Sequence, residues 1–164
     1  MFRTMRRDTQ QLSTSECENI LMRGTSGVLA VSGDDDYPYA VPLSYVYRDS
    51  KLVFHCARSG HKLDAIRRNA KTSFCVIDRD DVIPSEFTTY FRSVIAFGKA
   101  RVLEGESEAR AALELLAEKY TPGDEPGRRR EVEKTLTRVC MIELVVEHMT
   151  GKEARELVKM KKTD

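Results

Sequence analysis

The chain has 164 residues, a length that suits one domain with a single core. Its 27 basic and 26 acidic residues leave a net charge of +1, and with no tryptophan and no basic block it offers little to a nucleic-acid partner. No apolar run approaches the roughly 18 residues that span a bilayer. The cationic N-terminus lacks the apolar stretch of a secretory signal. A cytoplasmic location is therefore expected, with neither a membrane nor nucleic acid as partner.

The cysteines and histidines follow no metal-binding pattern. None of the four cysteines stands in a C-x-x-C pair, and the three histidines form no H-E-x-x-H motif. Scattered cysteines are typical of small buried residues in a reducing compartment. No metal site is expected.

The first segments predict an arm, a helix and a strand. Residues 1–12 are polar and predict an N-terminal arm. Ser13 and Glu16 have the spacing of a capping box, which predicts a helix that ends at Gly24. A short apolar strand is expected at 27–32.

The next run, YPYAVPLSYVY at 37–47, is strand-like and aromatic but contains Pro38 and Pro42. Proline has no N–H, so one edge of this strand must be unpaired at those two points. Either this is an ordinary edge strand, or the edge is free because a ligand lies along it.

The following segment combines a strand, a turn and a helix in a way that can hold an anion. Residues 52–56 predict a strand, 58–60 a turn, and about 61–68 a helix with Ser59 as its N-cap. A helix N-terminus offers free N–H groups and partial positive charge, and Lys62 adds a full charge. Neither GxxxxGK[ST] nor GxGxxG is present, and a lysine at this position is otherwise simply solvated.

The remaining segments alternate strands with peripheral helices. They predict a strand at 71–78, a loop at 80–87, a strand at 88–103 with a bulge or bend at Gly98, a helix at 106–120, a linker at 121–127, a charged solvated helix at 128–136, a strand at 138–147 and a basic helical tail at 152–162. Six strands in this arrangement indicate a mainly β (α+β) fold built on an antiparallel barrel. The domain is expected to span 13–150, between the arm (1–12) and the tail (151–164).

Four segments in this order resemble one known family. Residues 27–30, 37–47, 54–69 and 87–100 are similar to motifs of the pyridoxamine 5′-phosphate oxidase-like flavoproteins, and within them of the nitroimidazole-resistance (Nim) branch. The resemblance extends over about residues 13 to 148.

The resemblance implies a six-stranded antiparallel split β-barrel that binds FMN at a homodimer interface. The implied function is that of an FMN-dependent oxidoreductase that reduces a small-molecule acceptor, for example a nitroaromatic compound. The alternatives are a flavin or deazaflavin-dependent reductase on the same barrel, a haem-binding or haem-degrading split barrel, and a non-catalytic flavin-binding module.

The resemblance also assigns flavin contacts. One strand carries the flavin ring along its backbone, the end of the next strand touches the ring, a cation pair grips the phosphate, and a later polar residue reaches the flavin. In chain order the assigned residues are Val41, Pro42, Leu43, Ser44, Tyr45, His55, Cys56, Ser59, His61, Lys62 and Ser93.

Several roles stay open. His61, the candidate catalytic residue, could donate to the phosphate, lie under the flavin or cap the turn. His55 is either a ring contact or a packed strand residue. Tyr45 and Tyr47 are either ring neighbours or barrel-surface aromatics. Arg67 and Arg92 could add charge to the site or be solvated.

The sequence also departs from the oxidases. Their arginine and lysine on the ring-binding strand correspond to Ala40 and Tyr45, and their first phosphate cation corresponds to His61. Their substrate-binding tryptophan has no counterpart in a chain without tryptophan. Oxidation of pyridoxamine phosphate itself is therefore not expected.

Overall fold

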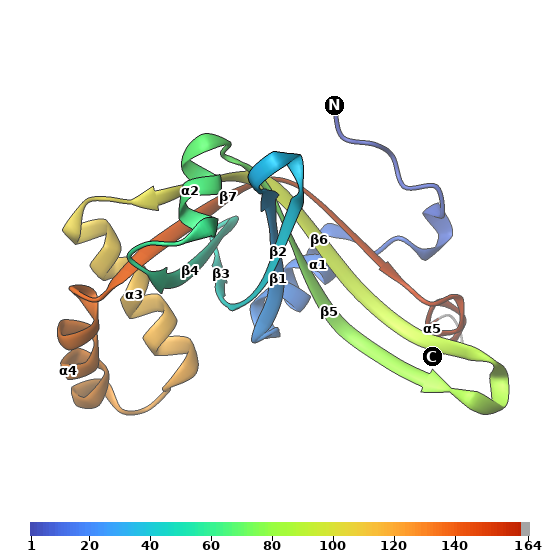
Figure 1. The fold of residues 1–164 in the computed structure, drawn as a ribbon. Coiled ribbons are helices and arrows are strands. Elements are labelled where there is room, and N and C mark those ends of the chain that lie inside the picture. Colours follow the sequence, from blue (N-terminus) through green and yellow to red (C-terminus); the bar gives the residue numbers. More distant parts are fainter. Residues whose placement is uncertain (162–164) are drawn as a thin grey trace.

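One antiparallel sheet curls into a split barrel in the computed structural model, which describes residues 1–161 (Figure 1). The strand order is β2-β1-β5-β6-β7-β4-β3. The strands are β1 (Ser26–Ser32), β2 (Pro38–Ser44), β3 (Val46–Arg48), β4 (Lys51–Ala57), β5 (Lys71–Ile83), β6 (Thr88–Leu103) and β7 (Val139–Glu153). The helices are α1 (Thr14–Arg23), α2 (His61–Arg68), α3 (Glu106–Tyr120), α4 (Glu125–Leu136) and α5 (Arg155–Met160). The predicted fold class is confirmed, with seven strands instead of six.

The seventh strand arises because the run 37–47 breaks at Tyr45 into β2 and β3. The Tyr45 side chain is fully buried, and its backbone is tied to the end of α3. The Tyr45 N–H donates to the Tyr120 hydroxyl oxygen at 3.0 Å, and the Tyr120 hydroxyl donates to the Tyr45 carbonyl at 2.9 Å. The side chain of Tyr120 thus satisfies the polar backbone groups that the strand break releases.

β2 is an edge strand, as its prolines predict, because it pairs only with β1. The Gly33 N–H donates to the Tyr37 carbonyl at 2.8 Å in the same register. Hydrogen-bonded pairs alternate along an antiparallel ladder. Tyr39 and every second residue after it therefore bond to β1, while Pro38 and Pro42 fall at positions whose backbone faces away from β1. The prolines cost β2 no ladder hydrogen bond.

The hairpin of β5 and β6 is longer than expected. β5 continues to Ile83 past a bulge between Ile77 and Arg79, so the loop predicted at 80–87 is wrong except for the turn at its end. The pairing of β5 with β6 continues as far as Ile83 and Thr88. The hairpin projects away from it (Figure 1), and Tyr90 packs there in a small cluster with α5.

The C-terminal tail begins later than expected. β7 continues to Glu153, because the strand pairs with β6 as far as Arg92. The Glu153 carboxylate is buried and accepts from Arg92 Nε at 2.9 Å, with Lys161 Nζ 2.6 Å away. Arg92 is therefore paired and not simply solvated, whereas exposed Arg67 lies 3.8 Å from Asp64 on the helix surface. Of the predicted tail helix, residue 162 lies outside the described residues.

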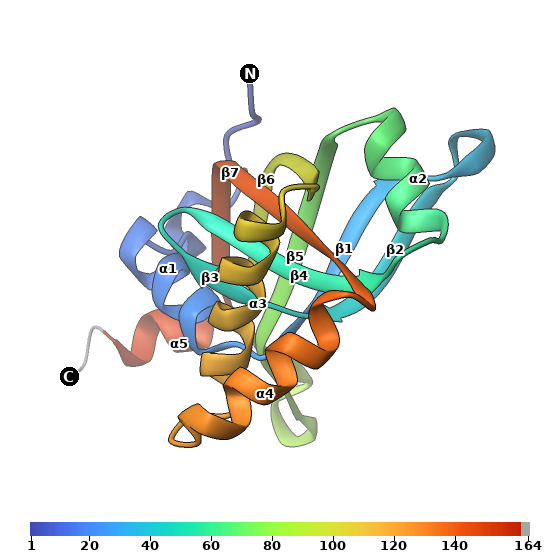
Figure 2. The ribbon, with the colours of Figure 1, turned by 90° about the vertical axis from the view of Figure 1, so that its left-hand side faces the viewer.

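Two other boundaries also shift. The end of the predicted arm is packed, since Leu12 is buried in the core and the Gln10 side chain donates to the Glu153 carbonyl at 2.8 Å. α4 begins inside the predicted linker, because the Asp124 side chain accepts from the Gly127 N–H at 2.9 Å and so caps the helix earlier. α4 is not fully solvated either, since it lies beside α3 (Figure 2) and its Val132 is buried against α3 and β7.

The capping box at Ser13 and Glu16 is confirmed, and it gives a pH-dependent prediction. The Glu16 carboxylate accepts hydrogen bonds from Lys161 and from the Ser13 N–H. These bonds lower the Glu16 pKa from 4.5 to about 2, and the bond from Lys161 has the larger effect. A carboxyl group whose pKa falls on folding stabilises the fold above its unfolded pKa, and loses that contribution as the pH falls through the folded pKa. Glu16→Gln should therefore unfold at lower urea concentration than wild type at pH 7, and the difference should shrink between pH 4.5 and about 2. The exposed Glu114→Gln serves as control, and a Glu16→Gln difference that does not shrink toward pH 2 would contradict the prediction.

Candidate functional site

The helix N-terminus at α2 forms at Gly60, not at Ser59. Gly60 is the N-cap with φ of 137°, a conformation that favours glycine. The exposed Ser59 side chain makes no capping bond, so the prediction for Ser59 as N-cap is wrong. The N–H groups of Leu63 and Asp64 both donate to the Gly60 carbonyl. Within residues 1–161 the N–H groups of His61 and Lys62 have no hydrogen-bond acceptor, so both are free for an anion.

Lys62 supplies a cation beside these N–H groups. Its side chain is half-buried and has no hydrogen bond or ion pair with any residue of the described chain. It lies close enough to β4 to act on Cys56. Burial raises the pKa of the Cys56 thiol, and the Lys62 charge opposes that rise. An unpaired lysine at a helix N-terminus fits a phosphate.

His61 is held by residues that the sequence did not single out. Its ring stacks on Tyr39 with centroids 4.2 Å apart, and its Nε2 lies 3.6 Å from Asp34 Oδ2. That distance is too long for a hydrogen bond, and Nε2 is buried without a partner in the described residues. Asp34 also accepts from Arg68 Nη1 at 3.1 Å. The imidazole thus lies against the turn between β1 and β2 and does not cap the helix.

The outer edge of β2 offers backbone groups to a ligand. By the ladder alternation, the N–H groups of Ala40 and Ser44 and the carbonyls of Ala40, Pro42 and Ser44 face away from β1. The side chains of Pro42 and Ser44 are exposed. Val41 and Leu43 instead pack against the core and bond to β1. Within the predicted ring-binding stretch, the backbone groups of Pro42 and Ser44 are therefore available to a ligand, and those of Val41 and Leu43 are not.

Tyr45 and Tyr47 are core residues, so neither is a barrel-surface aromatic. Tyr45 is 0% exposed and Tyr47 is 7% exposed. The Tyr45 ring meets Phe74 edge-on, with centroids 4.9 Å apart, and burial raises the pKa of its hydroxyl. A ring buried in this way cannot stack on a flavin, so Tyr45 can contribute only through its backbone.

His55 and Cys56 face opposite sides of β4. Cys56 is buried in the core, while His55 is exposed, so His55 is not a packed strand residue. His55 lines one hollow together with Ser44 of β2. The structure therefore brings the ends of two predicted flavin-contact segments together.

Ser93 lies on β6, far along the strand from the point where the end of α2 meets it. It pairs with Ile77 on β5 and Lys152 on β7. The end of α2 contacts β6 near Ala100, whose N–H donates to the Ala70 carbonyl. Ser93 is seven residues from Ala100, which at about 3.3 Å per residue places it roughly 23 Å along the strand.

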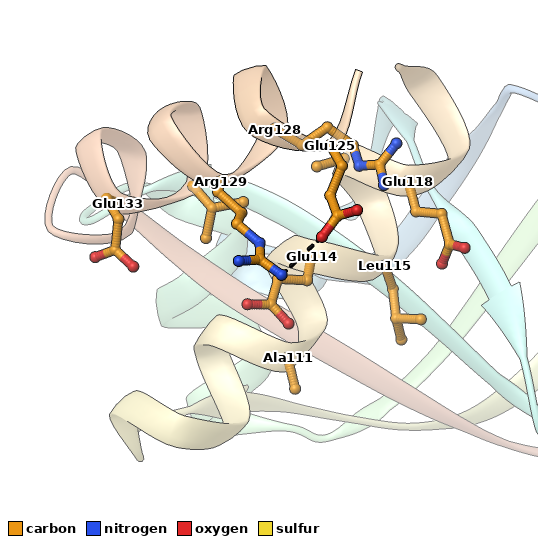
Figure 3. A pocket seen from close by; sticks show the side chains of 10 residues that line it. Ala111, Glu114, Leu115, Glu118, Glu125, Arg128, Arg129 and Glu133 are labelled. Atoms are coloured by element: carbon orange, nitrogen blue, oxygen red, sulfur yellow. Dashed lines mark hydrogen bonds and ion pairs between the residues drawn. The ribbon is translucent and has the colours of Figure 1, made fainter. Parts of the chain in front are cut away.

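The hollow of about 680 Å³ between α3 and α4 does not have the chemistry of a cofactor site (Figure 3). Its polar lining consists of four glutamates and two arginines from the two helices. Arg129 donates to Glu125 at 2.6 Å, and these side chains are 80% and 63% exposed. Exposed charges of both signs are solvated, and they offer little to an apolar ring.

The family of the chain follows from a match to a family model. The model described as pyridoxamine 5′-phosphate oxidase matches residues 13–153. The chain belongs to this family. The resemblance inferred from the four segments is confirmed, and the match reaches the end of β7.

Several solved structures of about 20% sequence identity have the same fold as this chain. A candidate 5-nitroimidazole antibiotic resistance protein from Bacteroides thetaiotaomicron is 21% identical with a TM-score of 0.70, over 87% of this chain and 86% of that one. Protein Rv2991 from Mycobacterium tuberculosis is 20% identical with a TM-score of 0.80, over 94% and 92%. An FAD and haem binding protein from Mycobacterium smegmatis is 22% identical with a TM-score of 0.74, over 90% and 74%.

No curated protein matches the chain. Among residues 1–161, no helix has both the length and the apolar character needed to cross a membrane.

Proposed function

We propose that the protein is an FMN-binding oxidoreductase that passes electrons to a small acceptor. The observation that carries this proposal is the unpaired Lys62 beside the free N–H groups of α2, next to a strand edge with free backbone groups. The family supports a flavin, and structural relatives are described as FAD-binding proteins from Mesorhizobium loti and Mycobacterium smegmatis. One helix N-terminus with one lysine suits a single phosphate group, which favours FMN over FAD.

The residues of the chain divide the work of holding FMN. Lys62 and the N–H groups of His61 and Lys62 hold the phosphate, and the outer edge of β2 from Ala40 to Ser44 lies along the ring. His55 contacts the ring from β4, whereas the His61 side chain lies at the phosphate end, where it stacks on Tyr39. Bound FMN would supply the electron transfer, while the protein binds and orients it. A nitroaromatic acceptor agrees with the Nim-like relative.

Haem is the second candidate, because a relative binds both FAD and haem. His148 stacks on Phe2 at 4.6 Å, and His61 stacks on Tyr39. Only exposed His55 has no aromatic stacking partner among the described histidines. The Lys62 ammonium and the free N–H groups can bind a phosphate but cannot coordinate the iron of haem. FMN is therefore the proposed cofactor.

Titration of the apo-protein with FMN, followed by flavin fluorescence, tests the proposal. Quenching that saturates with a dissociation constant of about 1 μM or lower is expected, which corresponds to roughly 8 kcal/mol of binding free energy. No quenching at saturating flavin, or a Soret band in the purified protein, would contradict it. A cytoplasmic location belongs to the same proposal, because free thiols at all four cysteines fit a reducing compartment.

A homodimer is part of the proposal, because the outward face of the sheet carries exposed apolar side chains, among them Val28 and Ile77. Register partners share a face, so Pro42, Val28, Cys75 and Ile95 form one outward row. Ile77 beside this row is 65% exposed. Ser93, the register partner of Ile77, lies on the same face. A second subunit that covers this face could bring its own copy of Ser93 to the flavin.

Ile77→Lys is therefore expected to convert a dimer into a monomer without unfolding the domain. A charge at the centre of an apolar contact loses its hydration in the dimer, but it stays solvated in the monomer. Light scattering across a range of concentrations measures the mass, and Met22→Lys on exposed α1 serves as the control. A monomeric mass for wild type at every concentration would contradict the proposed dimer.

A further inference from the structure

A smaller hollow lies on the sheet side of the α3–α4 pair. It measures about 380 Å³ and is named the α4 pocket here. Four elements line it, through Ser44 at the end of β2, His55 on β4, Leu116 and Tyr120 on α3, and Val132 on α4. Ligand sites usually measure about 300–1,000 Å³. The volume therefore suits a molecule with one ring or two fused rings.

The lining of the α4 pocket is mostly apolar. Leu116 and Val132 are each 4% exposed, and Leu113 and Ala117 extend the same surface. Of the lysines and arginines in residues 1–161, none lines the pocket, whereas Glu131 does. An anion would meet this negative charge without compensation, and any charged ligand would lose hydration against the apolar lining, so the pocket favours a neutral ligand.

Polar groups that could orient a ligand come from two sides. His55 has no hydrogen bond or ion pair with any residue in the described part of the chain, so its ring nitrogens are free. On α4 the Thr135 hydroxyl donates to Glu131 Oε1 at 3.0 Å, which leaves the Thr135 oxygen as an acceptor. His55 is thus an available donor to an oxygen atom of a ligand.

The outer groove of Figure 3 is the contrasting case. It shares Ala117 and Val132 with the α4 pocket but is otherwise lined largely by charges. Figure 3 shows Arg129 bonded to Glu125 and pointing toward Glu114 of α3. The two sides of the same helix pair therefore differ: the outer side is charged and solvated, and the sheet side is apolar.

We propose that the α4 pocket binds the electron acceptor, a neutral aromatic molecule with an oxygen-bearing group such as a nitro or quinone group, with His55 donating to that oxygen. This inference rests on the proposed flavin function, because Ser44 and His55 also border the surface assigned to the flavin ring. A ring in the α4 pocket lies beside the flavin ring, and the phosphate is held at the other end, by α2. The pocket thus supplies a separate place for the acceptor.

Binding of 4-nitrobenzyl alcohol to the purified protein, measured by ligand-observed NMR, tests the proposal without requiring turnover. Ala117→Phe should weaken binding by about tenfold or more, because the added phenyl ring would occupy the space of the ligand. Ala111→Phe is the matched control, since exposed Ala111 lines the outer groove on the same helix. The anionic 4-nitrobenzoate should bind wild type at least about tenfold more weakly than the neutral alcohol.

FMN affinity is measured on the same variants to separate the two proposals. Retained FMN binding with lost nitroaromatic binding in Ala117→Phe supports an acceptor site. Equal nitroaromatic binding by wild type and Ala117→Phe overturns it, and so does a loss of FMN binding that matches the loss of the nitroaromatic, because the pocket would then hold the flavin itself. If wild type binds the nitroaromatic but not FMN, the flavin proposal fails. A loss of nitroaromatic binding in Ala117→Phe would then still assign the pocket to a neutral aromatic ligand.

Discussion

Lys62→Ala is expected to lower FMN affinity by roughly ten- to a hundredfold while the domain stays folded. The lysine has no ion pair within residues 1–161, so its removal leaves no buried partner charge behind. A charge-assisted contact to phosphate is worth about 1.5–3 kcal/mol. Fluorescence titration measures the change in affinity, and thermal unfolding checks the fold.

Riboflavin separates a phosphate contact from a structural effect. It lacks the phosphate, so Lys62→Ala and wild type should bind it about equally. Lys71→Ala, at the start of β5, is the matched lysine control and should bind FMN as wild type does. A Lys62→Ala variant that loses riboflavin and FMN affinity alike would mean that the lysine is structural.

His61→Ala should have a smaller effect on FMN affinity than Lys62→Ala. The imidazole stacks on Tyr39 and its Nε2 lies 3.6 Å from Asp34 Oδ2, so the side chain is directed toward the turn between β1 and β2. One hydrogen bond from a neutral imidazole is worth about 1 kcal/mol. The same titration measures this difference, and a loss larger than that of Lys62→Ala would transfer the main phosphate contact to His61.

Gly98→Ala is expected to destabilise the protein by about 3 kcal/mol or more, an effect at the upper end for a single substitution. A Cβ at Gly98 would lie within 1.9 Å of the Val145 carbonyl oxygen on β7. The obstacle is backbone in the centre of the sheet, at the bulge between Phe97 and Gly98, so no side chain can move aside. Urea unfolding measures the loss.

Gly105→Ala is the matched control for this substitution. A Cβ there meets only the Glu108 side chain at 3.6 Å, an ordinary contact distance. Its unfolding midpoint should stay close to that of wild type. A Gly98→Ala variant as stable as Gly105→Ala would mean that β6 and β7 do not approach this closely.

The sequence correctly predicted those elements that are marked by their own residues. The capping box at Ser13, the helix 61–68, the strand 88–103 and the bulge at Gly98 all appear as predicted. The two prolines of β2 correctly predicted an unpaired edge, because a missing N–H is a local property with a direct consequence for pairing.

Features that depend on distant residues could not be predicted in this way. The break at Tyr45 is stabilised by Tyr120, which lies 75 residues away. β7 extends to Glu153 because Arg92 and Lys161 compensate a buried carboxylate, and no short pattern joins these three residues. The extent of a strand thus depends on its partners as well as on its own residues.

The candidate site was predicted in outline, and the roles of its side chains needed the structure. The anion-binding order of strand, turn, helix and lysine is visible in the sequence, whereas the capping role moved from Ser59 to Gly60. The contacts of His61 with Tyr39 and Asp34 come from two other segments, and only the folded chain brings them together. The α4 pocket forms between four elements, so no single stretch of sequence carries its signal.

A crystal structure of the protein with bound FMN tests the central claim most directly. The phosphate is expected within hydrogen-bond distance of Lys62 Nζ and of the free N–H groups at the start of α2, with the ring along the outer edge of β2 between Ser44 and His55. A phosphate bound away from α2, or crystals without flavin after soaking at saturating FMN, would contradict the account.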